Sequence, residues 1–469
     1  MPPFVGGRRT RRGGGGVAVL DGGGGTVGGG VTGSGLRAPD SESRRFPPAH
    51  VSSGFLERVL LCAAAGTHAG TRRLEGPVHL EYTQGQQQLR AELRAYFDGL
   101  VPGNAYARYG EPAAQKRFYR ETIRRLGTDG WLGVGWPEEY GGRGLTPMEQ
   151  FIFFDEAAQA GVPLPLMALN TVGPTIMQYG TDEQKAYFLP RILSGEIDFA
   201  IGYSEPGAGT DLASLTTRAV REGDTYVVNG QKIWTTNGDT ADWVWLAVRT
   251  DPDAPPHKGI TMLLVPTSDP GYSCTIINTL ASHDTTASYY EDVRVPVSRR
   301  VGEENKGWRL ITNQLNHERV TLAAHGTMAI RALHDVQRWA AATKLADGRR
   351  VIDLGWVRGR LARTHVRLDA MKLLNWQMVG AVQDGSLTPQ DASAVKVYGS
   401  EARRDAYAWL MEVVGAAGPL KEGSAGAVLH GSLERGYRSA VIFTFGGGNN
   451  EIQREIISWI GLGMPRVRR

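Results

Sequence analysis

The chain has 469 residues, 41% of them hydrophobic, which is enough for about two or three domains with large cores. We find no uninterrupted apolar run of roughly eighteen residues, so no membrane-spanning helix is expected. The only cysteines, Cys62 and Cys274, rule out a disulfide framework and favour a reducing cytoplasm as the location. The formal net charge of +4 comes from residues 1–77, which carry ten arginines and five acids, so the near-neutral remainder does not predict a nucleic-acid binder.

Residues 1–77 form a leader with 19 of the 62 glycines and no lysine. Such a composition predicts disorder, because it offers little apolar surface to offset the entropy of ordering. A targeting segment and a glycine-rich nucleic-acid tail are alternatives, but the apolar stretch at 59–65 lies deep in the chain and stacking aromatics are missing. We favour a translated upstream region, with the domain starting at Val78, since GTG, one of the valine codons, starts translation in some genomes.

Residues 78–198 show helical periodicity. Helices are predicted over residues 84–100, 115–127 and 146–160, with a loop rich in glycine and aromatic residues at 131–144. Thr181 and Gln184 form the capping-box pattern, which predicts a helix start that continues through Leu193.

The pattern changes near residue 199. Residues 225–229, 243–248 and 260–265 are rich in β-branched and aromatic side chains, which predicts strands, and Asn229-Gly230 and Asn237-Gly238 are turn signals. The β region is expected to end near Val301. Helical periodicity then returns, and helices are predicted over residues 308–343, 353–384, 389–414 and 427–462. Helices, then strands, then helices indicate an α+β multidomain protein.

Two glycine-containing motifs are candidates for ligand binding: residues 202–211 (GYSEPGAGTD) and 229–238 (NGQKIWTTNG). The first offers unpaired amides and hydroxyls to a ligand, and the second offers the flat ring of Trp234 with two threonine hydroxyls. Taken singly, the first is also compatible with a structural turn and the second with a core tryptophan at a strand end.

Taken together and in order, these motifs resemble the acyl-CoA dehydrogenase family. Further matches are residues 181–185 with Leu189-Pro190, residues 305–308 and residues 451–457, so the resemblance covers about residues 78–465. It implies a helical N-terminal domain (78–198), a middle β domain (199–304) and a C-terminal four-helix bundle (305–469). It also implies that FAD binds between the middle domain and the bundle.

The resemblance assigns cofactor contacts to Ser204, Thr210, Trp234, Thr236, Gly415, Gly418, Asn449 and Glu451. Ser204 resembles the hydroxyl residue beside the flavin pyrimidine, and Thr210 one that meets the pyrophosphate. Trp234 is similar to a tryptophan beside the isoalloxazine, and Thr236 to a threonine near flavin N5. Gly415 and Gly418 lie in a turn that receives a neighbouring subunit's FAD. The usual Arg-x-x-Phe-Gly motif is replaced by residues 344–350 (KLADGRR).

The reaction of this family needs a carboxylate base, whose pKa is raised by a dry pocket. Many members of the family carry this base near the C-terminus, at the position that Gly447 occupies in this sequence, and glycine has no carboxylate. Isovaleryl-CoA dehydrogenase belongs to a subset with the base in a Leu-x-x-Glu-Arg pattern, and residues 315–319 (LNHER) match it. The resemblance therefore implies Glu318 as the base and Arg319 as a substrate contact, with Glu318 predicted on the apolar helix face of Ile311. His317 is interpreted as structural.

The favoured interpretation is an FAD-dependent dehydrogenase of acyl-CoA, with electron-transferring flavoprotein as electron acceptor and no metal. Two alternatives stay open: a non-catalytic chain of a heteromeric dehydrogenase, and a flavin monooxygenase or oxidase on the same scaffold. The assembly is expected to be a homodimer, a homotetramer or a heterotetramer with a homologous chain. Residues 446–448 and 347–350 resemble actinobacterial relatives that act on steroid-derived acyl-CoAs as two-gene heterotetramers.

Overall fold

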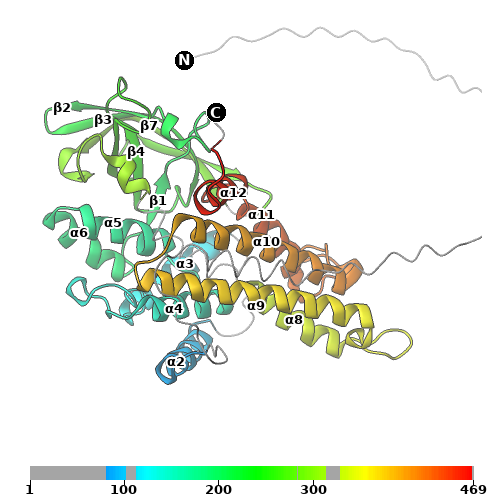
Figure 1. Ribbon diagram of the computed structural model, residues 1–469. Coiled ribbons are helices and arrows are strands. Elements are labelled where there is room, and N and C mark those ends of the chain that lie inside the picture. Colours follow the sequence, from blue (N-terminus) through cyan, green and yellow to red (C-terminus); the bar gives the residue numbers. More distant parts are fainter. Residues whose placement is uncertain (1–80, 102–111, 282–283, 313–327, 467–469) are drawn as a thin grey trace, which may run out of the picture. The chain divides into compact units, whose positions relative to one another are not determined.

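The computed structural model describes residues 81–101, 112–281, 284–312 and 328–466. The predicted leader, residues 1–77, lies outside the described residues. Helices form the first part of the described chain (Figure 1): α2 Gln84–Leu100, α3 Pro112–Thr128, α4 Pro147–Ala160, α5 Gly173–Tyr179 and α6 Asp182–Leu193. The predicted capping box is confirmed, since the Thr181 hydroxyl accepts from the Gln184 amide and the Gln184 side-chain oxygen accepts from the Thr181 amide.

An eight-stranded sheet follows, in the order β6-β7-β3-β2-β4-β5-β8, with β1 paired in parallel to β4. Its strands are β1 Phe199–Gly202, β2 Arg218–Glu222, β3 Thr225–Thr236, β4 Trp243–Arg249, β5 Ile260–Pro266, β6 Tyr272–Asn278, β7 Asp284–Pro296 and β8 Arg300–Val301. Strands β4 and β5 are buried along almost their whole length, which explains their continuous apolar sequences. The three predicted strand segments are thus confirmed as parts of β3, β4 and β5.

One predicted turn signal is wrong. Asn229 and Gly230 lie inside β3, where the register against β7 shifts, and the turn between β2 and β3 is instead formed by Gly223 and Asp224. Gly230 serves close packing rather than chain reversal. A Cβ atom at this position would lie 2.8 Å from the Thr217 backbone.

The last part of the described chain is helical: α8 Met328–Ala342, α9 Gly355–Gln383, α10 Pro389–Val414, α11 Ser432–Ile442 and α12 Asn450–Ile456. Helices α8, α9 and α10 pack along one another around a common core (Figure 1). The order of a helical, a β and a second helical region is therefore confirmed. Of the predicted helix 308–343, both ends are helical and residues 313–327 lie outside the described residues.

The prediction of one continuous helix over residues 427–462 is wrong. The chain leaves the helical path between α11 and α12, where Gly447 and Gly448 have φ angles of 67° and 91°. Glycine adopts this left-handed backbone without a steric penalty, so the glycine run breaks the helix. Apolar periodicity continues on both sides of the break, which is why the sequence suggested a single helix.

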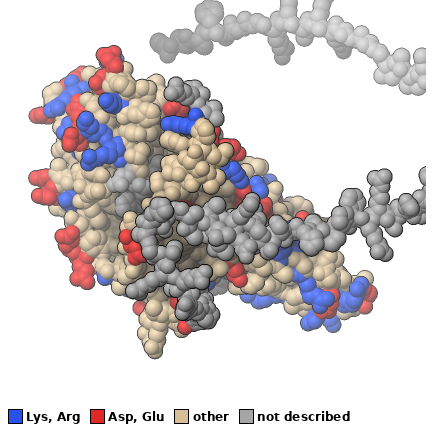
Figure 2. All heavy atoms as spheres, viewed as in Figure 1, with Lys and Arg blue, Asp and Glu red and all other residues tan. Residues whose placement is uncertain are grey.

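Charged side chains are mixed on the face shown in Figure 2, in keeping with the near-neutral composition after the leader. Among the described residues, we find no helix long and apolar enough to cross a membrane. The same part of the chain contains no cluster of three or more side chains suited to holding a metal ion.

Candidate cofactor-binding site

The two sequence motifs meet at the end of β1. The chain leaves β1 through Tyr203 and Ser204, and the Ser204 carbonyl accepts a hydrogen bond from the Ile233 amide of β3 at 2.8 Å. Glu205 and Ala208 then exchange two backbone hydrogen bonds across a tight turn that contains Gly207. The backbone of Ser204 therefore lies directly beside the strand that carries Trp234.

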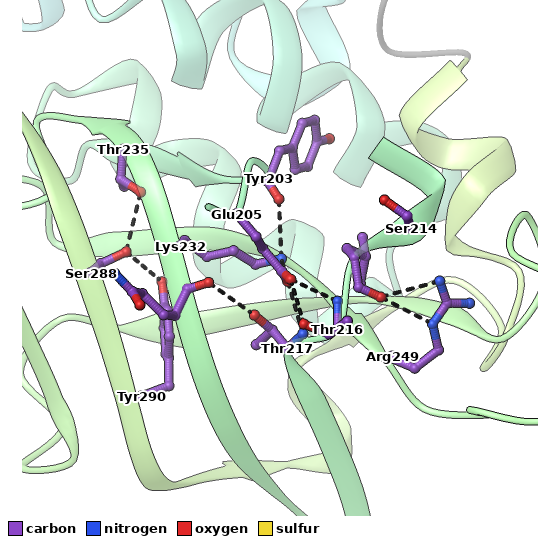
Figure 3. Close-up of polar contacts among 12 residues, drawn as sticks. Tyr203, Glu205, Ser214, Thr216, Thr217, Lys232, Thr235, Arg249, Ser288 and Tyr290 are labelled. Atoms are coloured by element: carbon purple, nitrogen blue, oxygen red, sulfur yellow. Dashed lines mark hydrogen bonds and ion pairs between the residues drawn. The ribbon is translucent and has the colours of Figure 1, made fainter. Parts of the chain in front are cut away.

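A buried ion pair links the same two segments (Figure 3). Lys232 Nζ of β3 lies 2.8 Å from Glu205 Oε1 and donates to the Tyr203 carbonyl at 3.1 Å. The Lys232 side chain is fully buried and that of Glu205 is 5% exposed. The carboxylate also accepts from the Thr216 amide and hydroxyl at 2.7 Å and from the Thr217 amide at 2.8 Å.

These contacts shift the pKa values of both side chains, Glu205 and Lys232. Burial opposes ionisation of Glu205, but the Lys232 ammonium and the hydrogen bonds from Thr217 outweigh burial and lower the carboxyl pKa to about 2. Burial lowers the pKa of Lys232 to about 8, because the attraction of Glu205 only partly offsets the loss of hydration. At neutral pH the pair is therefore charged on both sides.

A second buried cation fixes the chain just after the loop. The Arg249 guanidinium of β4 donates to the carbonyls of Ala213 at 2.6 Å and Leu215 at 3.3 Å. Both carbonyls belong to the short turn that follows residues 202–211. Side chains from two strands thus hold the entry and the exit of the glycine-rich loop.

Trp234 is not a core residue. The residue is 56% exposed, and its φ angle of 63° lies at the second register shift of β3, between Ile233 and Thr235. Thr235 instead turns inward, where its hydroxyl lies 3.1 Å from that of Ser288. Trp234 and Thr236 are both left exposed on either side of the buried Thr235. The bulge therefore leaves the Trp234 ring and the Thr236 side chain exposed at the surface.

A contact with the C-terminal helices completes this surface. Asn449 Nδ2 donates to the Thr210 hydroxyl at 3.3 Å, across 239 positions of the sequence. Asn449 also caps α12, because its Oδ1 accepts from the Ile452 amide at 2.8 Å. Lys396 of α10 holds the preceding turn by donating to the Gly448 carbonyl at 2.5 Å. Glu451 lies exposed in the first turn of α12.

Other predicted site residues are not joined to this surface by the contacts of the described residues. Gly415 ends α10 with a φ angle of 71° and is exposed, whereas Gly418 is buried, and a Cβ atom there would lie 2.6 Å from the Met411 carbonyl. Glu318 and Arg319, the predicted base and substrate contact, lie outside the described residues, as does His317.

The sequence interpretation missed the groups that support the site, above all Glu205, Lys232 and Arg249. A signal was present for two of them, since the first motif contains acidic residues and the second contains a lysine. The glycines of the motifs and Trp234 were interpreted as groups that bind a ligand, whereas Glu205 and Lys232 were assigned no role. Their pairing depends on long-range packing between β1 and β3, which local periodicity does not report.

Models of the acyl-CoA dehydrogenase N-terminal, middle and C-terminal domains match residues 83–196, 200–293 and 305–460. The chain therefore belongs to the acyl-CoA dehydrogenase family, and it is an oxidoreductase of the class that acts on CH–CH groups. The three-domain architecture expected from the resemblance is confirmed.

Several relatives are similar over their full length. Acyl-CoA dehydrogenase FadE26 of Mycobacterium tuberculosis is 52% identical over 405 residues, covering 84% of this chain and all of the relative. A solved structure described as the Tcur3481-Tcur3483 steroid ACAD is 51% identical with a TM-score of 0.78, covering 83% of this chain and 100% of that one. The ChsE4-ChsE5 complex from M. tuberculosis is 52% identical with the same TM-score and coverage.

Proposed function

We propose that this chain catalyses FAD-dependent α,β-dehydrogenation of an acyl-CoA thioester to the trans-2-enoyl-CoA. The observation that carries the proposal is the surface formed by Ser204, Thr210, Trp234, Thr236 and Asn449. It combines an exposed aromatic ring with hydroxyl and amide groups from both the sheet and α12.

This donor set fits a flavin nucleotide. A largely exposed tryptophan beside strand hydroxyls suits a flat aromatic ring, which gains contact area by lying against it. Gly207 and Gly209 have open space where a Cβ would be, so their backbone amides stay approachable for phosphate oxygens. In the proposed role, Trp234 and Thr236 contact the isoalloxazine, Ser204 the pyrimidine edge, and Thr210 the pyrophosphate.

FAD, when bound, supplies the acceptor for the hydride that leaves the β-carbon. The remaining chemistry falls to the protein. Glu318 is proposed to remove the α-proton, which the thioester acidifies, and Arg319 to contact the substrate. Glutamate suits this step because a dry environment raises a carboxyl pKa toward working pH. The tail slot at Gly447 is exposed and has no side chain, so it offers no competing base.

The named structures extend the proposal to a substrate class and a partner. One similar structure is a steroid ACAD and another is the ChsE4-ChsE5 complex, so the proposed substrate is a steroid-derived acyl-CoA and the proposed partner is a homologous chain. Exposed apolar side chains near the C-terminus are compatible with such assembly. These are Trp459, Ile460, Leu462 and Met464. Electron-transferring flavoprotein is the proposed electron acceptor.

The test is anaerobic titration of the purified protein, alone and co-expressed with a homologous chain, against straight-chain, branched and steroid-derived acyl-CoAs. Bleaching of the flavin band by one class, with formation of the enoyl product, is expected. The alternative of a non-catalytic chain predicts that bleaching persists in the complex when Glu318 is replaced by Gln. An oxidase or monooxygenase predicts rapid reoxidation by oxygen without added acceptor.

A further inference from the structure

The ion pair of Lys232 and Glu205 has no part in the chemistry proposed above. Two buried charges cost hydration energy, and a buried ion pair is often no more stabilising than a well-packed apolar pair. The pair nevertheless lies where the two motifs meet, with both side chains almost fully excluded from water. Its position, rather than its contribution to stability, therefore calls for an explanation.

The contacts of Lys232 bracket one residue of the loop. Its ammonium binds the Tyr203 carbonyl on one side of Ser204 and the Glu205 carboxylate on the other. The Ser204 carbonyl itself is bound by the amide of Ile233, the residue after Lys232. Three consecutive residues, Tyr203, Ser204 and Glu205, are thus held against the part of β3 that leads directly to Trp234.

The contacts of Glu205 tie a third segment to the same point. Both carboxylate oxygens are used, one by Lys232 and the Thr217 amide and the other by Thr216. Figure 3 shows these dashed contacts converging on Glu205 between the loop and the strand. The Glu205 carboxylate therefore connects the start of the loop to β3 and to residues 216–217, which follow the loop.

We propose that Lys232 and Glu205 are positioning residues that set the distance between Ser204 on the loop and Trp234 with Thr236 on the strand. This inference rests on the proposed function, because the three groups are the ones assigned to the flavin ring. Binding groups on two separate segments act together only when their spacing is held, and supporting residues locked by packing provide that constraint.

The test compares Lys232→Met, Glu205→Gln and the double variant in the full chain, with any partner chain that the wild type needs. FAD affinity is measured after reconstitution of the apoprotein, and the visible spectrum of the bound flavin is recorded. Each single variant should weaken FAD binding about tenfold or more, because it leaves a buried charged group without its partner. The spectrum should also lose resolution as the ring environment becomes heterogeneous. Because the pair acts as one unit, the double variant should weaken binding no more than either single variant.

The matched control is the double variant Arg90→Met/Arg94→Met, which removes both cations from another buried carboxylate. Arg90 and Arg94 of α2 each lie 2.7 Å from Glu156 of α4, whose side chain is 3% exposed. This variant should lower the melting temperature while leaving the FAD dissociation constant and the spectrum unchanged. A merely structural role for Lys232 and Glu205 predicts the same behaviour for their variants, and that result would overturn the inference.

Thr216→Val provides a milder variant that keeps both charges and removes one hydroxyl hydrogen bond to Glu205. We expect its FAD dissociation constant to rise about twofold to tenfold. An unchanged constant and spectrum for Thr216→Val would also count against the inference if Lys232→Met failed to fold. Failure of the wild type to take up FAD would instead refute the proposed function itself.

Discussion

The Asn449 side chain makes two hydrogen bonds, and two substitutions at this position can separate their contributions. Its Oδ1 caps α12 through the Ile452 amide, and its Nδ2 donates to the Thr210 hydroxyl. Asn449→Asp keeps an oxygen for the cap and removes the donor to Thr210. Asn449→Ala removes both interactions while leaving the backbone unchanged.

The magnitudes follow from these contacts. Loss of an Asn cap costs about 0.5–2 kcal/mol, so Asn449→Ala should lower the free energy of unfolding by about 1 kcal/mol. Asn449→Asp should stay within about 0.5 kcal/mol of the wild type, because aspartate caps as well as asparagine and its charge suits a helix N-terminus. The lost bond to Thr210 is 3.3 Å long, so its contribution should be at the low end of about 0.5–1.5 kcal/mol.

The assay measures urea unfolding and FAD affinity on the same preparations. Asn449→Asp should unfold like the wild type but bind FAD about twofold to fivefold more weakly. Its carboxylate can only accept from the Thr210 hydroxyl, which is then no longer directed toward a phosphate oxygen of the cofactor. Thr210→Val, which keeps the Asn449 cap, is the control for the hydrogen bond. Wild-type FAD affinity in both variants would refute the idea that this contact shapes the site. Equal unfolding midpoints for Asn449→Ala and the wild type would refute the capping argument.

Four further predictions concern the base, the ring contacts and the buried pair. Glu318→Gln should slow flavin reduction in stopped-flow measurements by about 10²–10⁴-fold without loss of FAD, and a near wild-type rate would place the base elsewhere. Adding Gly447→Glu to that variant should restore little activity and destabilise the fold, because Gly447 has a φ angle of 67°. Trp234→Ala and Thr236→Ala should each weaken FAD retention with little change in melting temperature, since both residues are exposed. Because the Glu205 pKa falls from 4.5 to about 2 on folding, its stabilisation is present above pH 4.5 and is lost as pH falls toward 2, by on the order of 3 kcal/mol. Urea midpoints at about pH 5 and pH 3 should therefore differ more for the wild type than for Glu205→Gln, and equal differences would contradict this reasoning.

The sequence by itself determined the order of the three regions and several helix ends. Periodicity of 3.6 and strand composition report local structure directly, so α2 and α10 were predicted with the bounds that they have. The resemblance of two short motifs directed the prediction of cofactor contacts to Ser204, Thr210, Trp234 and Thr236, because the glycines and hydroxyls that a ligand needs lie close together along the chain.

Only the tertiary structure decided which side chains of the two motifs are exposed and which buried side chains hold the motifs in place. Local patterns allowed Trp234 to be a core residue, and only the register shift against β7 turns it toward solvent while burying Thr235. The contact of Thr210 with Asn449 and the pairing of Lys232 with Glu205 join residues that are 239 and 27 positions apart. Such contacts arise from the packing of whole strands and helices, so neither periodicity nor composition within a short window carries information about them.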